Sequence, residues 1–367
     1  MRKSFLILHL ALFSFGYGMA VFALPPFVTV LGAGQFYLGE FGFFLMLPNV
    51  VLPYFFSKLK NLDTVSKFVI FGTLTTGSTI FLLIIEKSLN LVLVITLVLG
   101  IGQFIWWITT EIFFTGISRG TNLINIYSVV WGTSYFIAPL LAGYMIQRVG
   151  YAPVFSVSFA MVMIAIIMFI IAINQEKFRR IDTFESSKGT RILIESFIPS
   201  FGAGIVFGTL TSIFPGFLLH NGITVLELGI LSSALAMTRL VGFIYLTRIS
   251  DVKKLRNMLN LSFLLLIPII LPFLVINFYV LLAMMLIIGF STAFGISAPL
   301  IYISNIKEAN VSKNIALYEL SFGSSVSIFA LIGGYISQQI GNRWPYFIDF
   351  VIIAVMAIYF IRAGRRR

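Results

Sequence analysis

The chain has no cysteine, only two histidines, and few charged residues of either sign. Without cysteine it cannot form disulfides, thiolate metal sites or a thiol nucleophile, and two histidines offer little for metal ligation or acid–base chemistry. Charged residues make up 10% of the sequence, whereas soluble domains contain about 25%. These shortages exclude a disulfide scaffold and argue against a soluble enzyme, and we expect neither a metal nor a cofactor.

Hydrophobic residues are abundant instead, at 59% of the chain with a mean hydropathy of +1.02. No soluble core could bury such a sequence from end to end, so most of it must face lipid. The apolar runs are each near the ~20 residues that a helix needs to cross a bilayer, and strand-like alternation is absent. We therefore expect an all-α membrane protein with twelve transmembrane helices, at about 5–29, 37–57, 67–85, 91–114, 123–146, 151–173, 195–219, 226–247, 257–276, 279–303, 313–337 and 344–362.

Basic residues are distributed unevenly between the two sides of the membrane. If both termini are cytoplasmic, cytoplasmic segments hold 21 of the 25 Lys and Arg residues, three lie outside and Arg239 lies within a span. This bias follows the positive-inside rule and accounts for the net charge of +12 without nucleic acid as a partner. We expect a multi-pass protein of the plasma membrane with both termini cytoplasmic.

The second half of the chain repeats the first. Residues 127–150 and 318–341, at a constant offset of 191, are identical at nine of 24 positions. An earlier stretch agrees at offset 190. Shared glycines, tyrosines and prolines in order indicate two copies of one unit; examples are Tyr127/Tyr318, Gly143/Gly334, Pro25/Pro215 and Gly39/Gly229.

The one long hydrophilic segment lies between the two copies of the repeat, where a linker is expected. We expect an N-terminal six-helix bundle over 1–173, a cytoplasmic linker over 174–194, and a C-terminal six-helix bundle over 195–367. The other loops are short, and no phosphate-binding P-loop is present. ATP-driven transport within this chain is therefore not expected.

This plan resembles the major facilitator superfamily, and several motifs agree. Residues 138–143, APLLAG, look like the family's span-5 antiporter motif with two Gly-to-Ala changes. Glu111 and Arg119-Gly120 resemble the Glu…Arg-Gly signature of sugar porters, one residue longer than usual. The loop after span 2, SKLKNLDTVSK, keeps only basic residues and a displaced Asp63 of the family's loop motif, and the loop from Arg248 to Lys254 is a closer match.

The resemblance implies a secondary transporter for a small organic molecule, whose halves rock about a central site. It implies that spans 1, 4, 7 and 10 line a cavity, that spans 2, 5, 8 and 11 form the contact between the halves, and that the rest brace the outside. The repeat supports the same mechanism on physical grounds, because two related bundles can open alternately to opposite sides. We expect a monomer.

Ionisable residues within spans are costly in lipid and mark candidate pathways. Arg239 and Glu319 occur in only one copy of the repeat, where the other copy has Asn49 and Ser128. One hypothesis makes Glu319 a proton carrier, or a contact for a charged substrate, with Arg239 influencing it. The alternative is a static ion pair that joins spans 8 and 11.

Other candidates lie on span 4 and near the cytoplasmic loops. Gln103, Trp107 and Glu111 share one helix face, which suits a flat or amphipathic substrate if it faces the cavity, or an interfacial aromatic belt if it does not. Glu111 fits a cytoplasmic gate, a direct proton site or a solvated interfacial acid. Further pathway candidates are Tyr17, Asn49, Ser128 and Trp131, with Tyr127 and Tyr318 as weak ones. The remaining gate candidates are Arg119, Lys58, Lys60, Arg248 and Asp251.

Three classes of function compete. A membrane enzyme needs a cluster of acids, histidines or lysines that the sequence does not contain. A membrane sensor that binds without translocating stays open. Among transporters, proton-coupled efflux of hydrophobic or amphipathic compounds is the leading hypothesis, because of the span-5 motif and the aromatic residues. Uptake of a sugar or another small metabolite is the alternative, supported by the Glu…Arg-Gly signature.

Overall fold

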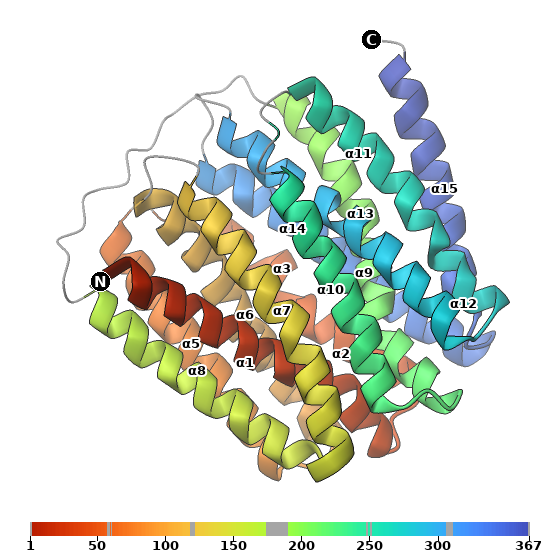
Figure 1. The fold of residues 1–367 in the computed structure, drawn as a ribbon, viewed down its shortest axis with the longest axis horizontal. Helices are drawn as coiled ribbons and strands as arrows, with labels where there is room; N and C mark the ends of the chain where they lie inside the picture. Colours follow the sequence, from red (N-terminus) through yellow and green to blue (C-terminus); the bar gives the residue numbers. More distant parts are fainter. Residues whose placement is uncertain are drawn as a thin grey trace.

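The computed structural model describes residues 2–56, 59, 61–117, 122–173, 190–246, 249, 252–305 and 311–365 (Figure 1). All the secondary structure within these ranges is helical. The N-terminal half contains α1 (Arg2–Val30), α2 (Gln35–Met46), α3 (Pro48–Val51), α4 (Pro53–Phe56), α5 (Leu62–Ile85), α6 (Leu89–Ile117), α7 (Asn122–Val149) and α8 (Tyr151–Ile173). The C-terminal half contains α9 (Thr190–His220), α10 (Val225–Leu246), α11 (Val252–Leu266), the 3-10 helix η1 (Ile267–Ile270), α12 (Leu271–Leu274), α13 (Phe278–Asn305), α14 (Val311–Gln339) and α15 (Trp344–Arg365).

These elements form twelve membrane crossings. Among the described residues, eleven helical segments are long and apolar enough to span a bilayer, and α15 adds the shorter apolar stretch Trp344–Phe360. The expected all-α, twelve-helix membrane fold is confirmed. The linker expected over 174–194 lies mostly outside the described residues, although α9 already begins at Thr190.

Prolines break two of the crossings into shorter helices. Span 2 changes from α2 to α3 at Pro48 and from α3 to α4 at Pro53, and span 9 passes through η1 around Pro268. Proline has no N–H to donate and its ring crowds the preceding turn, so the regular hydrogen-bond ladder is interrupted there. The break at Pro48 places Asn49 at the start of a short helix that faces the other half of the protein.

The chain folds as two bundles that meet along two pairs of helices. Within the N-terminal half, α1 packs on α7 and α8, and α5 packs on α6; within the C-terminal half, α9 packs on α14 and α10 on α13. Between the halves, the most extensive contacts are α7 with α10 and α2 with α14. Spans 5 and 8 and spans 2 and 11 therefore join the halves, as the family resemblance implies.

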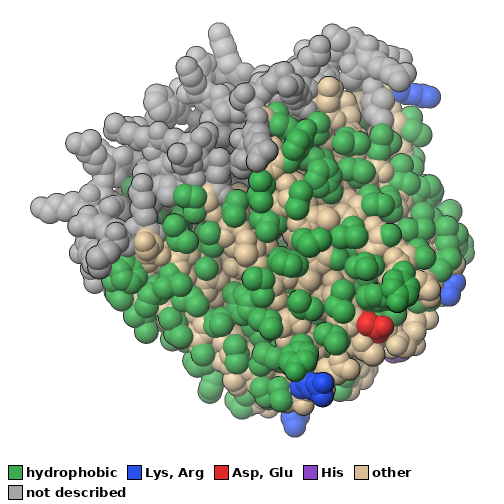
Figure 2. Space-filling model, viewed as in Figure 1, with side chains coloured by type: hydrophobic (Ala, Val, Ile, Leu, Met, Phe, Trp, Pro, Cys, Tyr) green, Lys and Arg blue, Asp and Glu red, His purple; other side chains and the backbone are tan. Residues whose placement is uncertain are grey.

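Each half has its own apolar core, and the perimeter is apolar as well. Large side chains such as Ile85, Ile167 and Val355 are more than half exposed. Figure 2 shows hydrophobic side chains spread over the described part of one face, with no charged side chain across its middle. Such a surface is stable only against hydrocarbon, so the exposed apolar belt marks where lipid contacts the protein.

Candidate functional site

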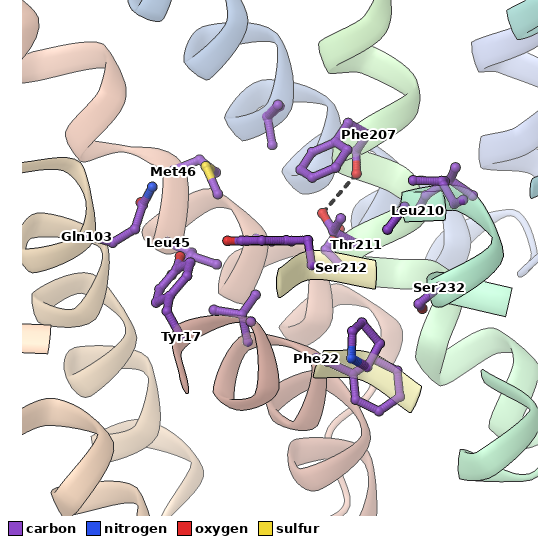
Figure 3. Close-up of a pocket in the computed structure, with 18 of the residues that line it drawn as sticks. Tyr17, Phe22, Leu45, Met46, Gln103, Phe207, Leu210, Thr211, Ser212 and Ser232 are labelled. Atoms are coloured by element: carbon purple, nitrogen blue, oxygen red, sulfur yellow. Dashed lines mark hydrogen bonds between the residues drawn. The ribbon is translucent and has the colours of Figure 1, made fainter. Parts of the chain in front are cut away.

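A cavity lies between the two halves of the protein. Its walls come from α1, α2, α3, α6 and α7 on one side and from α9, α10, α13 and α14 on the other. In Figure 3, Tyr17, Leu45 and Gln103 approach from the N-terminal half, opposite Phe207, Leu210 and Thr211 of the C-terminal half. Most of the lining is apolar or aromatic, with a few polar groups, which is the usual character of a site for a small organic ligand.

Positions related by the internal repeat face each other across this cavity. The duplicated offsets of 190 and 191 therefore describe a pseudo-twofold arrangement centred on the cavity. This symmetry also identifies a lining residue that the sequence analysis missed, because Phe207 is the repeat counterpart of Tyr17. The matched lining pairs include Tyr17/Phe207, Pro25/Pro215, Leu45/Leu235, Asn49/Arg239, Trp131/Phe322 and Tyr135/Val326.

Glu319 of α14 is buried and bonds to the other half of the protein. Its side chain is 4% exposed, and Oε2 accepts a hydrogen bond of 3.3 Å from Nδ2 of Asn49. Close approach of the two backbones brings them together, because a Cβ placed on Gly323 would collide with Asn49. This bond crosses the boundary between spans 2 and 11, so any tilt of the halves must alter it.

Glu111 lies near Glu319, one helical turn beyond Trp107 on α6. Both acids are buried and interact electrostatically. The Trp107 side chain lies beside both carboxyl groups. Trp107 and Glu319 line the cavity, whereas Glu111 does not. The two acids therefore form a cluster with one member from each half, at the end of the cavity nearer the termini.

Two tyrosines related by the repeat complete this acid cluster. Tyr127 and Tyr318 are both buried, and each lies within electrostatic range of Glu111 and Glu319. Sequence reasoning treated these tyrosines as markers of the repeat or as weak pathway candidates. Tyr127 lies on α7 and Tyr318 on α14, and their shared position near the two acids depends on how the two halves meet, which the local sequence does not specify.

Arg239 of α10 lines the same cavity but does not pair with Glu319. The side chain is 3% exposed, and its Nε donates a hydrogen bond of 3.1 Å to Oγ1 of Thr292. The pseudo-symmetry explains the separation. Span 11 packs on span 2, which gives Glu319 the neighbour Asn49, whereas span 8 packs on span 5, which places Arg239 beside Trp131. The ion pair considered from the sequence is therefore not formed in this structure.

The remaining pathway candidates divide into two groups. Tyr17, Gln103 and Trp131 line the cavity, and the Tyr17 hydroxyl, Gln103 Oε1 and Trp131 Nε1 have no hydrogen-bond partner among the described residues. Ser128 is only half-buried and is not a lining residue. The expected gate residues Arg119, Lys58, Lys60, Arg248 and Asp251 lie outside the described residues.

His9 is a structural residue in this conformation. Its Nδ1 lies 2.8 Å from the carbonyl oxygen of Ala165, and its Nε2 accepts from Nε1 of Trp106 at 3.1 Å. A carbonyl only accepts, so Nδ1 carries the proton and the ring is neutral. Both ring nitrogens are satisfied, and the imidazole joins α1, α6 and α8 within the N-terminal bundle.

The comparisons with known proteins agree with this architecture. The Major Facilitator Superfamily model matches residues 6–306 and 196–367. A point mutant of the nucleoside transporter NupG superimposes with a TM-score of 0.73 at 12% identity over 99% of both chains. The human organic anion transporter MFSD10 gives 0.71 at 12% identity over 97% of this chain and 98% of its own. A bacterial homologue of the human lysosomal transporter Spinster gives 0.68 at 15% identity over 98% and 96%.

At these identities the structural likenesses establish the fold alone, and the search of curated sequences found no match. Two six-helix bundles around a central cavity, with apolar helices long enough to cross a bilayer, define the fold of a multi-pass membrane transporter. The chain belongs to the Major Facilitator Superfamily. Membership of this transporter superfamily agrees with the expectation that the chain is not an enzyme.

Proposed function

We propose that this protein is a proton-coupled secondary transporter that exports hydrophobic or amphipathic organic compounds by alternating access. The observation that carries the proposal is the cavity between the halves, because it combines mostly apolar walls with buried acids at one end. A cavity with mostly apolar walls suits an organic molecule rather than an ion alone.

Proton coupling is supported by the position of the acid cluster. Glu111 and Glu319 come from different halves, and a hydrogen bond to Asn49 also crosses the boundary. When the halves tilt, the neighbours of each carboxyl group must change. Buried acids whose surroundings differ between two conformations can bind a proton in one and release it in the other.

The walls of the cavity favour a hydrophobic or amphipathic substrate. Phe22, Trp107, Trp131, Phe207 and Phe322 all line it, and aromatic surfaces provide large apolar contacts. A second candidate is uptake of a sugar or another small metabolite. It is supported by the Asn49 and Gln103 amide oxygens, which have no hydrogen-bond partner among the described residues, and by the likeness to a nucleoside transporter.

Replacement of Glu319 by Gln tests the proton-coupling proposal. The amide keeps the shape of the side chain but cannot exchange a proton, so substrate-driven proton movement should be abolished while binding is partly retained. The measurement uses proteoliposomes with an imposed pH gradient, a pH-sensitive dye inside, and a panel of amphipathic fluorescent dyes together with glucose and uridine.

Asp349→Asn is the matched control for this variant. Asp349 is equally buried, at 3% exposed, but it lies on α15 and does not line the cavity. It should leave the coupling unchanged. If Glu319→Gln keeps the proton response of the wild-type protein, Glu319 is not the coupling site. Accumulation of glucose or uridine and not of the dyes would favour the uptake alternative.

A further inference from the structure

Arg239 is a buried cation whose counter-ion is not found among the described residues. Within the described part of the chain, its guanidinium group makes one hydrogen bond, from Nε to Oγ1 of Thr292, and its Nη2 has no partner. Glu319 is the carboxylate that the sequence suggested as its ion-pair partner. It accepts a hydrogen bond from Asn49 instead, at the contact between spans 2 and 11. Arg239 lies instead at the contact between spans 8 and 5, where its neighbours are aromatic.

Two rings partly stabilise this cation. The guanidinium carbon lies 5.1 Å from the centre of the Phe207 ring and 5.9 Å from the centre of the Trp131 ring. Cation–π contacts of this kind attract the charge but do not neutralise it, and a buried ion without a partner is strongly unfavourable. If Arg239 served only to hold helices together, the remaining N–H groups of its guanidinium would not need to face a cavity. Arg239 nevertheless lines the cavity.

We propose that the transported compounds are organic anions, with a carboxylate or comparable oxyanion head group bound by Arg239 and an apolar body held against the aromatic walls. This inference rests on the proposed transport function and names its substrate class. Guanidinium donors are arranged as a planar fork that fits the two oxygens of a carboxylate, and Nη2 provides a free donor. The Thr292 bond holds the fork in position from α13.

The location of the acid cluster is compatible with an anionic ligand. Glu319 and Asn49 belong to α14 and α3, whereas the head group would lie on the side of α7 and α10. An anion in this cavity would also be driven outward by an inside-negative membrane potential, which fits export. Trp131 and Tyr135 line the cavity with ring centres 4.8 Å apart, and together they form an aromatic surface near Arg239 that suits a planar substrate body.

The test uses three probes that share one ring system and differ in charge. They are naphthalene-2-carboxylate, naphthalene-2-carboxamide and 2-naphthylmethylammonium, and the affinity of the purified full-length protein for each is measured by isothermal titration calorimetry. We expect the carboxylate to bind at least about tenfold more tightly than the neutral amide, because charge-assisted hydrogen bonds are roughly twice as strong as neutral ones and this difference corresponds to about tenfold in affinity. The ammonium probe should bind most weakly.

Variants at Arg239 assign the preference to one residue. Arg239→Gln should bring the carboxylate and amide affinities to within about twofold of each other, and Arg239→Lys should keep part of the preference because it retains charge without the planar fork. Arg343→Gln is the matched control. Arg343 is exposed, contacts the Phe273 carbonyl and does not line the cavity, so its loss removes the same charge and should leave the preference intact.

The wild-type probe series decides the proposal even if a variant does not fold. A protein that binds the carboxylate no better than the amide, or an Arg239→Gln variant that keeps the preference, overturns it. The binding measurement needs neither a proton gradient nor translocation. Anion preference without transport would therefore refute the proposed function alone, whereas proton-coupled transport of neutral compounds without anion preference would refute this inference alone.

Discussion

Trp106 and Trp107 are adjacent in α6 but have different environments. Trp106 is fully buried in the N-terminal bundle, where it stacks on Phe13 at 3.7 Å between ring centres and donates to His9. Trp107 points to the boundary between the halves, lines the cavity and packs edge-on against Trp131 at 5.1 Å. A shift of one residue rotates a helical side chain by about 100°, and this rotation separates a core residue from a ligand-facing one.

Replacing Trp107 by Ala should therefore weaken substrate binding without unfolding the bundle. Loss of an indole that packs on a ligand costs about 1–3 kcal/mol, which raises the dissociation constant roughly fivefold to 150-fold. Titration of a transported compound by isothermal calorimetry measures the change. Trp344→Ala is the control, because Trp344 is 40% exposed at the start of α15 and away from the cavity. Equal affinities for Trp107→Ala and the wild type would place the ligand elsewhere in the protein.

Sequence reasoning selected many of the cavity residues but not their partners. Charge within an apolar helix marked Arg239 and Glu319, and helical spacing marked Gln103 and Trp107; all four line the cavity. Which side chains meet depends on which helices face each other across the halves, and that information is not local. The Glu319–Asn49 bond joins residues 270 positions apart, and nothing near either residue indicates it.

At the scale of helices, four glycines allow the halves to approach closely. A Cβ added to Gly39 of α2 would lie 2.9 Å from Cα of Gly334 in α14, and one added to Gly143 of α7 would lie 3.3 Å from Cα of Gly229 in α10. Gly39 and Gly229 are repeat counterparts, as are Gly143 and Gly334. The α2–α14 and α7–α10 contacts are therefore related to each other by the repeat. Both lie at the end of the cavity away from the termini, where the helix backbones approach each other closely.

Substitution of Gly39 by Ala should weaken this contact and open that end of the cavity. The new methyl group would lie 2.7 Å from the Ala330 carbonyl oxygen and 2.9 Å from Gly334 Cα, and backbone cannot move aside as a flexible side chain can. Because the chain has no cysteine, Val21→Cys provides a unique thiol on the cavity wall. We expect a membrane-impermeant maleimide, added to intact cells, to label this thiol several-fold faster in the Gly39→Ala background.

Gly34→Ala is the control for this experiment. A Cβ at Gly34 would meet no neighbouring atom closer than 3.9 Å, so the labelling rate should match that of the parent protein. Identical rates for Gly39→Ala and Gly34→Ala would show that the glycine contact does not hold this end closed.

The helices themselves were more predictable than their interruptions. Apolar length placed all twelve spans, because lipid requires continuous backbone hydrogen bonding within each segment. The proline positions indicated where helices could break, but proline alone does not decide it. Pro48 and Pro53 end helices in span 2, whereas Pro25 and Pro26 lie within the continuous helix α1. The difference depends on packing around each turn, which the local sequence does not specify.

For the whole molecule, the duplicated sequence indicated two copies of one unit, and the structure contains two bundles with a cavity between them. Once offsets of 190 and 191 are recognised, the lining residues of one half identify those of the other. The repeat is also where the protein departs from symmetry. Asn49 corresponds to Arg239 and Ser128 to Glu319, so each of these two charged residues occurs in only one copy. The two halves therefore provide related walls with different polar groups, which suits a transporter whose halves tilt about one asymmetric binding site.

The orientation of the whole molecule in the membrane remains a prediction from its basic residues, and the absence of cysteine makes it directly testable. The segment 86–88 lies at the end of the molecule opposite the termini, and Ser88 is exposed there. Ser187 belongs to the expected cytoplasmic linker, which is rich in Lys and Arg. We expect a membrane-impermeant maleimide to label Ser88→Cys in intact cells, and to label Ser187→Cys only after the cells are permeabilised. The reverse pattern would invert the topology, and the export direction proposed for the transporter would then have to be reassigned.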